Sequence, residues 1–266
     1  MDFSREKNRP RKDIIMNKIF LTSSPFGPLD NSRTVEGFDP MNHLPENLSR
    51  FWRKNARCLV ISAFPSDIPA CEEMRESMEK SVRVNFPDIA CLDIWDDRSD
   101  DFSEQMLASY DVVFLGGGHV PTENAFFERI GLHENIQKYG GLVIGISAGT
   151  MNAAEVVYAQ PELEGEAVDP DYRRFIKGLG LTKINILPHY QMTKSFILDG
   201  MRLFEDITYG DSYGRRFLVL PDGSYYTFAD GVGTVWGESY EISDGEMRPV
   251  CRVGEHVIYG PDGAAE

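Results

Sequence analysis

Short apolar runs alternate along the chain with helix-like segments, and this alternation constrains the fold more than any other feature. Four runs of strand length lie at residues 57–62, 89–94, 111–115 and 141–145. The first is continuously apolar, which is typical of a strand buried on both faces of a parallel sheet. Between the runs, Met74, Met78 and Val82 recur at helical spacing. The pattern predicts an α/β fold in which a parallel sheet is covered on both faces.

The remaining elements follow the same reasoning. We predict further helices at residues 45–55, 103–109, 124–139 and 194–207, and further strands at 18–22, 184–187 and 217–220. Residues 1–15 are polar and aperiodic, so we expect a flexible N-terminal extension at 1–15 and a single α/β hydrolytic domain at 16–266. Residues 161–171 are acidic and loop-like. Asp-Gly pairs that begin at Asp230, Asp244 and Asp262 predict short β-hairpins near the C-terminus.

Composition excludes several classes of protein. The formal net charge of -15 argues against a nucleic-acid partner held by phosphate contacts. No apolar run approaches the roughly 20 residues that a membrane span needs, and the N-terminus has no secretory signal core. The four cysteines show neither CxxC pairing nor metal-ligand spacing. We therefore expect a cytoplasmic protein with no metal, no cofactor, no membrane partner and no nucleic-acid partner.

The strongest chemical signal is the G-x-S-x-G motif at residues 145–149. It stands directly after a predicted strand and before the helix-forming sequence Met-Asn-Ala-Ala. A nucleophile elbow requires this context, because the sharp turn lifts the serine hydroxyl out of the sheet at a helix N-terminus. The motif predicts Ser147 as the nucleophile, with the N–H of Ala148 among the groups that stabilise an oxyanion. The alternative is that Ser147 only caps the helix.

Three glycines, at residues 116–118, end the preceding strand. Glycines at the carboxyl end of a parallel strand allow a ligand to approach the backbone closely. We interpret Gly117 or Gly118 as the second donor of an oxyanion hole, and His119 as a residue that enters the site. The alternative is a plain tight turn. The sequence is not a Walker loop, because the Lys-Ser/Thr pair is absent.

A serine nucleophile needs a base, and an acid must orient that base. His189 follows a predicted strand and is expected at the same sheet edge as Ser147. Asp222 also follows a strand, in Leu-Pro-Asp-Gly, and is the first candidate for the acid. Glu162, in the acidic loop, is the competitor. Either carboxylate could instead be a solvated turn residue.

These motifs together resemble one known family. The order GGG, GISAGTMNAA, ILPHY and LPDG resembles the peptidase E (aspartyl dipeptidase) and cyanophycinase family of serine peptidases, over roughly residues 18–228. The resemblance implies a three-layer α/β sandwich with a mostly parallel sheet, related to the class I glutamine amidotransferases. It also implies a Ser-His-acid triad in that chain order, which maps onto Ser147, His189 and Asp222.

The chain also departs from the pattern of this family. The acid is a Glu in peptidase E itself, so Asp222 is a shorter substitute. The family has a further acidic residue downstream of the elbow, near the place of Glu162, and often Asn at the place of His119. Members that cleave Asp-X dipeptides use an Arg after the His motif, and none falls in register within residues 191–196.

The resemblance implies a dipeptidase or exopeptidase of short peptides, with Asp-X among the candidate substrates, that forms an acyl-enzyme on Ser147. A homodimer is compatible with the sequence. A cation for an acidic substrate side chain is available in Lys194 or Arg202. The acidic loop offers candidates to hold a substrate α-amine, namely Glu162, Glu164, Glu166, Asp169 and Asp171.

Two alternative functions remain open at this stage. An α/β-hydrolase esterase shares the G-x-S-x-G motif, but its chain order puts the histidine last and would require His256. A catalytically silent binding module on the same fold is the second alternative.

Overall fold

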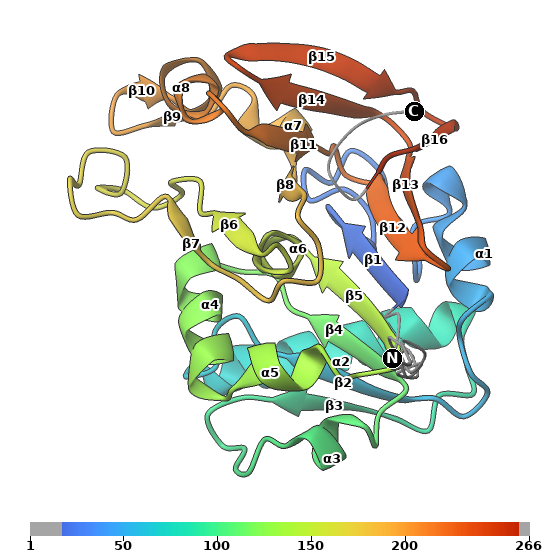
Figure 1. The fold of residues 1–266 in the computed structure, drawn as a ribbon. Helices are drawn as coiled ribbons and strands as arrows, with labels where there is room; N and C mark the ends of the chain where they lie inside the picture. Colours follow the sequence, from blue (N-terminus) through green and yellow to red (C-terminus); the bar gives the residue numbers. More distant parts are fainter. Residues whose placement is uncertain (1–17, 261–266) are drawn as a thin grey trace, which may run out of the picture.

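One large sheet organises the residues that the computed structural model describes, 18–260 (Figure 1). Five neighbouring strands run parallel: β1 (Lys18–Thr22), β5 (Leu142–Ile146), β4 (Val112–Leu115), β2 (Arg57–Ile61) and β3 (Cys91–Trp95). Beyond β1, the sheet continues with antiparallel strands, β12 (Tyr225–Ala229), β13 (Val232–Trp236) and β16 (His256–Ile258). The order is β16-β13-β12-β1-β5-β4-β2-β3, so the predicted α/β fold with a mostly parallel sheet is confirmed.

The central strands are buried on both faces, as their apolar sequences predict. In β4, Val112 and Phe114 join one hydrophobic cluster, and Val113 and Leu115 join another on the opposite face. The first cluster is covered by α1 (Leu44–Ser49) and α2 (Ile68–Asn85). The second is covered by α3 (Glu104–Leu107), α4 (Val120–Arg129) and α5 (Leu132–Ile136).

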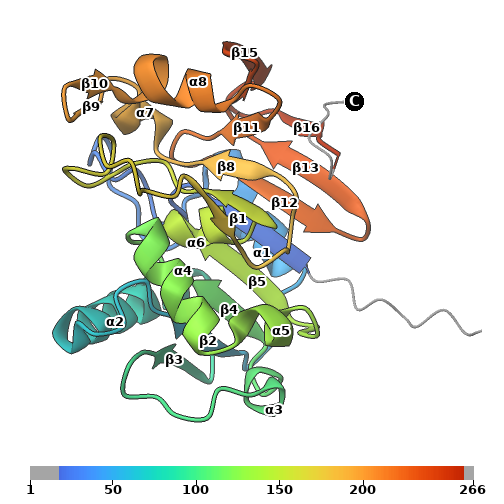
Figure 2. The same cartoon turned by 60° about the vertical axis from the view of Figure 1, so that its left-hand side comes forward.

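A second sheet packs beside the helices of that second face. It has the order β15-β14-β11-β8, formed by β8 (Asn185–Leu187), β11 (Arg216–Val219), β14 (Ser239–Ser243) and β15 (Glu246–Cys251). Ile186 and Leu218 of this sheet share a core with Ile19 and Val143 of the large sheet. Figures 1 and 2 show this sheet at one end of the molecule. The strands β8 and β11, which precede His189 and Asp222, are therefore fixed against the large sheet.

Three predicted helices differ from the structure. The helix expected at 45–55 ends at Ser49, and a turn follows at residues 50–51. The helix expected at 194–207 is wrong: α7 (Tyr190–Thr193) ends first, and β9 (Ile197–Leu198) and β10 (Met201–Arg202) form a hairpin. Asp199 and Gly200 take positive φ values of 52° and 81°, which suit a two-residue hairpin turn and not a helix. A π-helical turn, η2 (Leu203–Thr208), and α8 (Tyr209–Asp211) follow. The helix expected at 124–139 is divided into α4 and α5 by Gly131, whose φ is 65°.

The remaining sequence predictions stand as follows. The hairpins at Asp230 and Asp244 are confirmed as β12–β13 and β14–β15, with positive φ at both residues of each Asp-Gly pair. Residues 161–171 form a loop, which connects β6 (Val156–Tyr158) to its antiparallel partner β7 (Phe175–Lys177). The expected extension, residues 1–15, and the Asp-Gly pair at Asp262 lie outside the described residues.

Between residues 18 and 260, every helix is too short or too polar to cross a bilayer. In the same part of the chain, no three His, Cys, Asp or Glu side chains gather in a way that would hold a metal ion.

Candidate active site

Ser147 lies at the point where β5 turns into α6 (Ala148–Asn152). Its backbone has φ 51° and ψ -112°, a conformation that non-glycine residues adopt at a cost and that is common at functional sites. A Cβ at Gly149 would collide with the carbonyl oxygens of Leu115 and Gly116, so this position of the motif must be glycine. The Ser147 side chain makes no capping hydrogen bond to α6. The Ser147 hydroxyl is therefore not used to cap α6, and the helix-cap interpretation has no support.

His189 reaches this hydroxyl from the second sheet. It follows β8, and its Nε2 lies 2.8 Å from Ser147 Oγ. Like Ser147, it has a left-handed backbone, with φ 58°. Its N–H donates a hydrogen bond of 2.8 Å to the hydroxyl of Ser23, which holds the strained residue in place.

Asp222 completes the arrangement on the other side of the imidazole. It follows β11, and its Oδ1 lies 2.7 Å from His189 Nδ1. Oδ1 also accepts from Ser23 Oγ at 2.6 Å. Oδ2 accepts from Leu29 N–H at 2.9 Å and from Gln191 Nε2 at 2.6 Å. The structure thus brings together the three residues that the sequence singled out.

The carboxyl group of Asp222 is almost fully buried, with 1% of its side-chain surface exposed. Burial by itself raises its pKa, but hydrogen bonds from His189, Ser23 and Leu29 N–H outweigh it and hold the pKa below the usual value. The group is therefore an ionised acceptor near neutral pH. A carboxylate here selects the imidazole tautomer with the proton on Nδ1, which leaves Nε2 free to accept from Ser147.

Sequence reasoning missed Ser23 and Gln191. Ser23 follows β1 in a Ser/Pro/Gly-rich turn, and only the pairing of β1 with β5 shows that it ends at the same edge as Ser147. Gln191 was considered only as part of a stretch that lacks arginine. Its Oε1 accepts from Asp222 N–H at 3.0 Å while its Nε2 donates to the carboxylate, so it orients the acid at two points.

The backbone of the glycine turn lies close to the Ser147 side chain. A Cβ at Gly117 would lie 3.3 Å from Ser147 Cβ, so the glycine-rich turn passes directly beside the nucleophile. Among residues 18–260, no acceptor takes a hydrogen bond from the N–H groups of Gly117, Gly118 or Ala148. Unpaired N–H groups of this kind are what an oxyanion hole requires.

The hydroxyl opens into a cavity of about 390 Å³. Its wall is largely apolar, and the residues that line it come from the glycine turn, α6, the acidic loop and the segment after His189. They are Gly118, Val120, Ser147, Ala148, Met151, Gln160, Pro161, Glu162, Leu163, Pro188, His189, Met192, Thr193, Phe196 and Leu203.

Glu162 lines this cavity, whereas His119, which was expected to enter the site, is absent from the lining. Glu162 as a whole is exposed to solvent, yet the partial burial of its carboxyl raises the pKa of that group, and His119 opposes this shift. His119 Nε2 lies 2.8 Å from Glu166 Oε1. Glu166 also accepts from the N–H groups of Glu162 and Leu163, which folds the acidic loop onto His119. The structure places Glu162 in the wall of the cavity, while Asp222 is the carboxylate that bonds to the imidazole.

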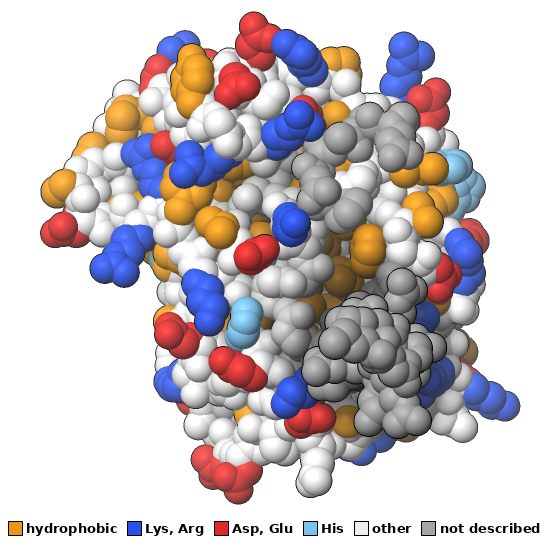
Figure 3. All heavy atoms as spheres, viewed as in Figure 1, with side chains coloured by type: hydrophobic (Ala, Val, Ile, Leu, Met, Phe, Trp, Pro, Cys, Tyr) orange, Lys and Arg blue, Asp and Glu red, His pale blue; other side chains and the backbone are white. Residues whose placement is uncertain are grey.

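A second contact ties the acidic loop to the β9–β10 hairpin. The carboxylate of Asp199 accepts from the N–H groups of Gly165 and Ala167 at 2.9 to 3.1 Å. Exposed apolar side chains gather on the acidic loop and on residues 192–197, which lead into the hairpin: Leu163, Val168, Met192, Phe196 and Ile197. Figure 3 shows apolar side chains in this region, at the left of the upper half. Of these side chains, Leu163, Met192 and Phe196 line the cavity, whereas Val168 and Ile197 do not.

The other weighed residues lie elsewhere. Glu164, Asp169 and Asp171 are exposed to solvent, and Lys194 and Arg202 do not line the cavity. Arg202 pairs with Asp206 at 2.6 Å. His256 stacks on Trp236 at the far edge of the large sheet, with ring centroids 4.4 Å apart. It therefore cannot serve Ser147, as the esterase alternative requires.

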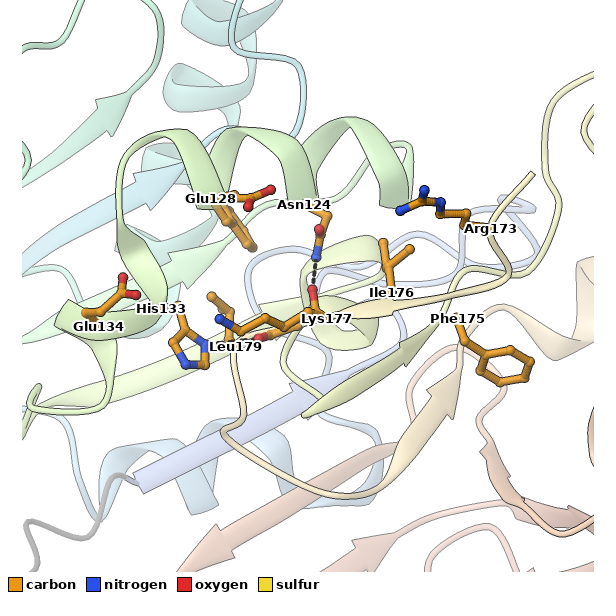
Figure 4. A pocket seen from close by; sticks show the side chains of 11 residues that line it. Asn124, Glu128, His133, Glu134, Arg173, Phe175, Ile176, Lys177 and Leu179 are labelled. Atoms are coloured by element: carbon orange, nitrogen blue, oxygen red, sulfur yellow. Dashed lines mark hydrogen bonds between the residues drawn. The ribbon is translucent and has the colours of Figure 1, made fainter. Parts of the chain in front are cut away.

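A separate cavity of about 420 Å³ lies between α4, α5 and β7 (Figure 4). Asn124 and Lys177 face each other there, because Asn124 Nδ2 donates to the carbonyl of Lys177. The lining of this cavity contains neither Ser147 nor His189.

Comparison with known proteins agrees with this geometry. The sequence matches the profile of peptidase family S51 over residues 32–207, and it matches no functionally curated protein. Two solved structures share the fold, each at 16% identity. A peptidase from an acI-B1 actinobacterium has a TM-score of 0.59, over 92% of this chain and 97% of that chain. A putative peptidase E protein from Listeria monocytogenes EGD-e has a TM-score of 0.55, over 89% and 100%.

Proposed function

The chain belongs to peptidase family S51 and is a serine-type peptidase, and on that premise we propose that it hydrolyses short peptides through an acyl-enzyme intermediate on Ser147. The observation that carries the proposal is the continuous hydrogen-bond chain from Ser147 Oγ through His189 to Asp222, at 2.8 and 2.7 Å. Such a chain activates a hydroxyl that is otherwise a weak nucleophile.

In the proposed mechanism, His189 Nε2 takes the proton of Ser147 as its Oγ attacks the peptide carbonyl. The N–H groups of Ala148 and of Gly117 or Gly118 hold the oxyanion that forms. Protonated His189 then gives its proton to the leaving amine, and the same base activates a water that hydrolyses the acyl-enzyme. Asp222 stabilises the imidazolium and remains ionised throughout.

We propose an exopeptidase, and specifically a dipeptidase, because the acidic loop forms one wall of the cavity. Glu162 lines that wall, where a carboxylate can pair with the free α-amine of a substrate. Two contacts fix the loop: Glu166 of the loop bonds to His119, and Ala167 N–H of the loop donates to Asp199 of the β9–β10 hairpin. A fixed wall of this kind would exclude a long polypeptide that must extend on both sides of the cleaved bond.

The architecture supports two further proposals. We propose that residues 16–266 form one hydrolytic domain, since both sheets contribute to one hydrophobic core. We also propose that the fold is related to that of the class I glutamine amidotransferases, in which the nucleophile likewise follows a central parallel strand.

A fluorophosphonate probe tests the mechanism directly. It should label Ser147 in the wild type and leave Ser147→Ala unlabelled, and the variant should lose about six decades of turnover. A silent binding module would show neither labelling nor turnover. The exopeptidase proposal is tested with a free dipeptide, its N-acetylated form and casein. Equal cleavage of free and acetylated dipeptide, or ready digestion of casein, would contradict it.

A further inference from the structure

The cavity beside Ser147 has an apolar floor and an apolar rim, and we infer from it the chemical class of the substrate. We propose that the residue on the acyl side of the cleaved bond carries an uncharged apolar side chain, such as leucine or methionine, and not a carboxylate. The inference rests on the proposed function, because it assumes that Ser147 is acylated by a peptide.

The floor of the cavity is formed by buried hydrocarbon side chains. Val120, Met151 and Leu203 are 3%, 7% and 3% exposed, and all three line the cavity. The three come from α4, α6 and η2, and they belong to one hydrophobic cluster with Ala148, the residue after the nucleophile. A substrate side chain that enters over this floor therefore meets mainly carbon atoms. The polar side chains of Gln160 and Thr193 also line the cavity, but they already donate hydrogen bonds to Thr208 Oγ1 and to the carbonyl of His189.

The rim is apolar where solvent exposure would favour polar residues. Leu163, Met192 and Phe196 line the cavity, although 51%, 44% and 43% of their surfaces are exposed. Grouped exposed side chains of this kind mark a binding surface. A bound apolar side chain would cover them, and that burial would favour binding.

Charge in the cavity also disfavours an acidic side chain. Among residues 18–260, no Lys or Arg lines the cavity, while Glu162 does. A substrate carboxylate would lose its hydration without gaining a cation, and it would face the charge of Glu162. The same Glu162 can pair with the α-amine, so the site suits a substrate that is positive at its amine and neutral in its side chain.

The cavity has a size that agrees with this class. Its volume of about 390 Å³ falls at the lower end of the range for small-ligand sites, roughly 300 to 1,000 Å³. A dipeptide with one medium-sized apolar side chain fits such a volume better than a longer peptide does.

The experiment compares dipeptides that share one leaving residue: Leu-Ala, Met-Ala, Ala-Ala, Asn-Ala and Asp-Ala. We expect kcat/KM for Leu-Ala to exceed that for Ala-Ala by about 10- to 100-fold. Asn-Ala, similar in shape to Leu-Ala, should be poorer, and Asp-Ala poorer still. The Asn-to-Asp step isolates the effect of charge.

Variants at the rim assign the preference to this cavity. Met192→Ala and Phe196→Ala should each lower kcat/KM for Leu-Ala by about 10-fold and change that for Ala-Ala by less than about 2-fold. Met192→Lys should raise kcat/KM for Asp-Ala. Ile197→Ala is the matched control, because Ile197 is 62% exposed, adjacent to Phe196 and absent from the lining. Ile197→Ala should leave kcat/KM unchanged for both Leu-Ala and Ala-Ala.

The outcomes separate this inference from the proposed function. Labelling of Ser147 by a fluorophosphonate together with a preference for Asp-Ala would overturn the inference and leave the proposed function intact. Equal effects of Met192→Ala on Leu-Ala and Ala-Ala would overturn it as well. If the wild type is neither labelled nor active on any of the five dipeptides, the proposed function fails, and the inference fails with it.

Discussion

Replacement of Asp222 by Asn should nearly abolish activity, and the structure gives the reason atom by atom. The carboxylate accepts four hydrogen bonds: Oδ1 from His189 Nδ1 and Ser23 Oγ, and Oδ2 from Leu29 N–H and Gln191 Nε2. An asparagine of the same shape has one acceptor oxygen and one NH2 donor. Either the His189–Ser23 pair or the Leu29–Gln191 pair must therefore face the asparagine NH2, and that pair loses its acceptor.

The pair that loses its acceptor is decided by which donors can adapt. Leu29 N–H is fixed by the backbone, and Gln191 cannot turn its amide without opposing the Asp222 N–H, which its Oε1 accepts. The Ser23 hydroxyl can rotate, and the imidazole can move its proton. The asparagine oxygen should therefore face Leu29 and Gln191, while its NH2 faces His189 Nδ1. That arrangement puts the imidazole proton on Nε2. A protonated Nε2 points its N–H at Ser147 and cannot accept the proton of the serine hydroxyl.

The expected cost is about four decades in kcat, which corresponds to about 5.5 kcal/mol in the activation free energy. KM should change little, because Asp222 does not line the substrate cavity. Steady-state hydrolysis of the best dipeptide and the rate of fluorophosphonate labelling measure the effect. Glu162→Gln is the matched control and should cost less than about 10-fold in kcat.

A second substitution tests the tautomer argument itself. In Asp222→Asn with Gln191→Glu, the new carboxylate can accept both the residue 222 N–H and the asparagine NH2, so the asparagine oxygen can turn back to His189 and Leu29 N–H is the one donor left facing the NH2. We expect the double variant to recover at least about one decade of kcat. A larger loss in Glu162→Gln than in Asp222→Asn would transfer the role of the acid to Glu162, and the absence of recovery would refute the tautomer argument.

Two further predictions concern stability and the cavity wall. Glu123 is fully buried, and burial raises the pKa of its carboxyl well above the usual value. Its contribution to stability is therefore fully present below its pKa in the unfolded chain, about 4.3, and is lost as the pH rises through the higher pKa of the folded state. The free energy of unfolding of Glu123→Gln should therefore rise relative to that of the wild type between pH 4 and pH 8, by up to about 1.4 kcal/mol for each pH unit in which the carboxyl stays protonated only in the folded state. Urea unfolding at several pH values measures this difference, and a difference that does not change with pH would contradict the prediction. Asp199→Ala removes the acceptor for Gly165 and Ala167 N–H, so limited proteolysis should cut residues 161–171 faster and KM should rise about 10-fold, whereas an unchanged cleavage rate would show that Asp199 does not hold the loop.

Local patterns in the sequence predicted the parts of the site that local geometry determines. The motif at 145–149 requires a strand-to-helix turn, and this placed Ser147 correctly. His189 and Asp222 were expected at the same sheet edge as Ser147, but they follow β8 and β11 of a second sheet, so their approach to Ser147 depends on how the two sheets pack. Ser23 was not predicted, because its role depends on β1 pairing with β5, about 120 residues away in the chain. The helix expected at 194–207 failed for a local reason. Asp199-Gly200 is itself a hairpin signal, and the apolar spacing around it concealed that signal.

The three residues of the proposed triad are distributed over two sheets. Ser147 follows β5 of the large sheet, whereas His189 and Asp222 follow β8 and β11 of the smaller one. Neither sheet carries the nucleophile together with its base and acid, so a chain in which only one sheet has formed should not cleave peptides. During synthesis or refolding, hydrolytic activity should therefore appear only after the sheets have docked, and recovery of turnover should lag behind recovery of β-structure. Hydrolytic activity therefore indicates that both sheets have formed and packed together.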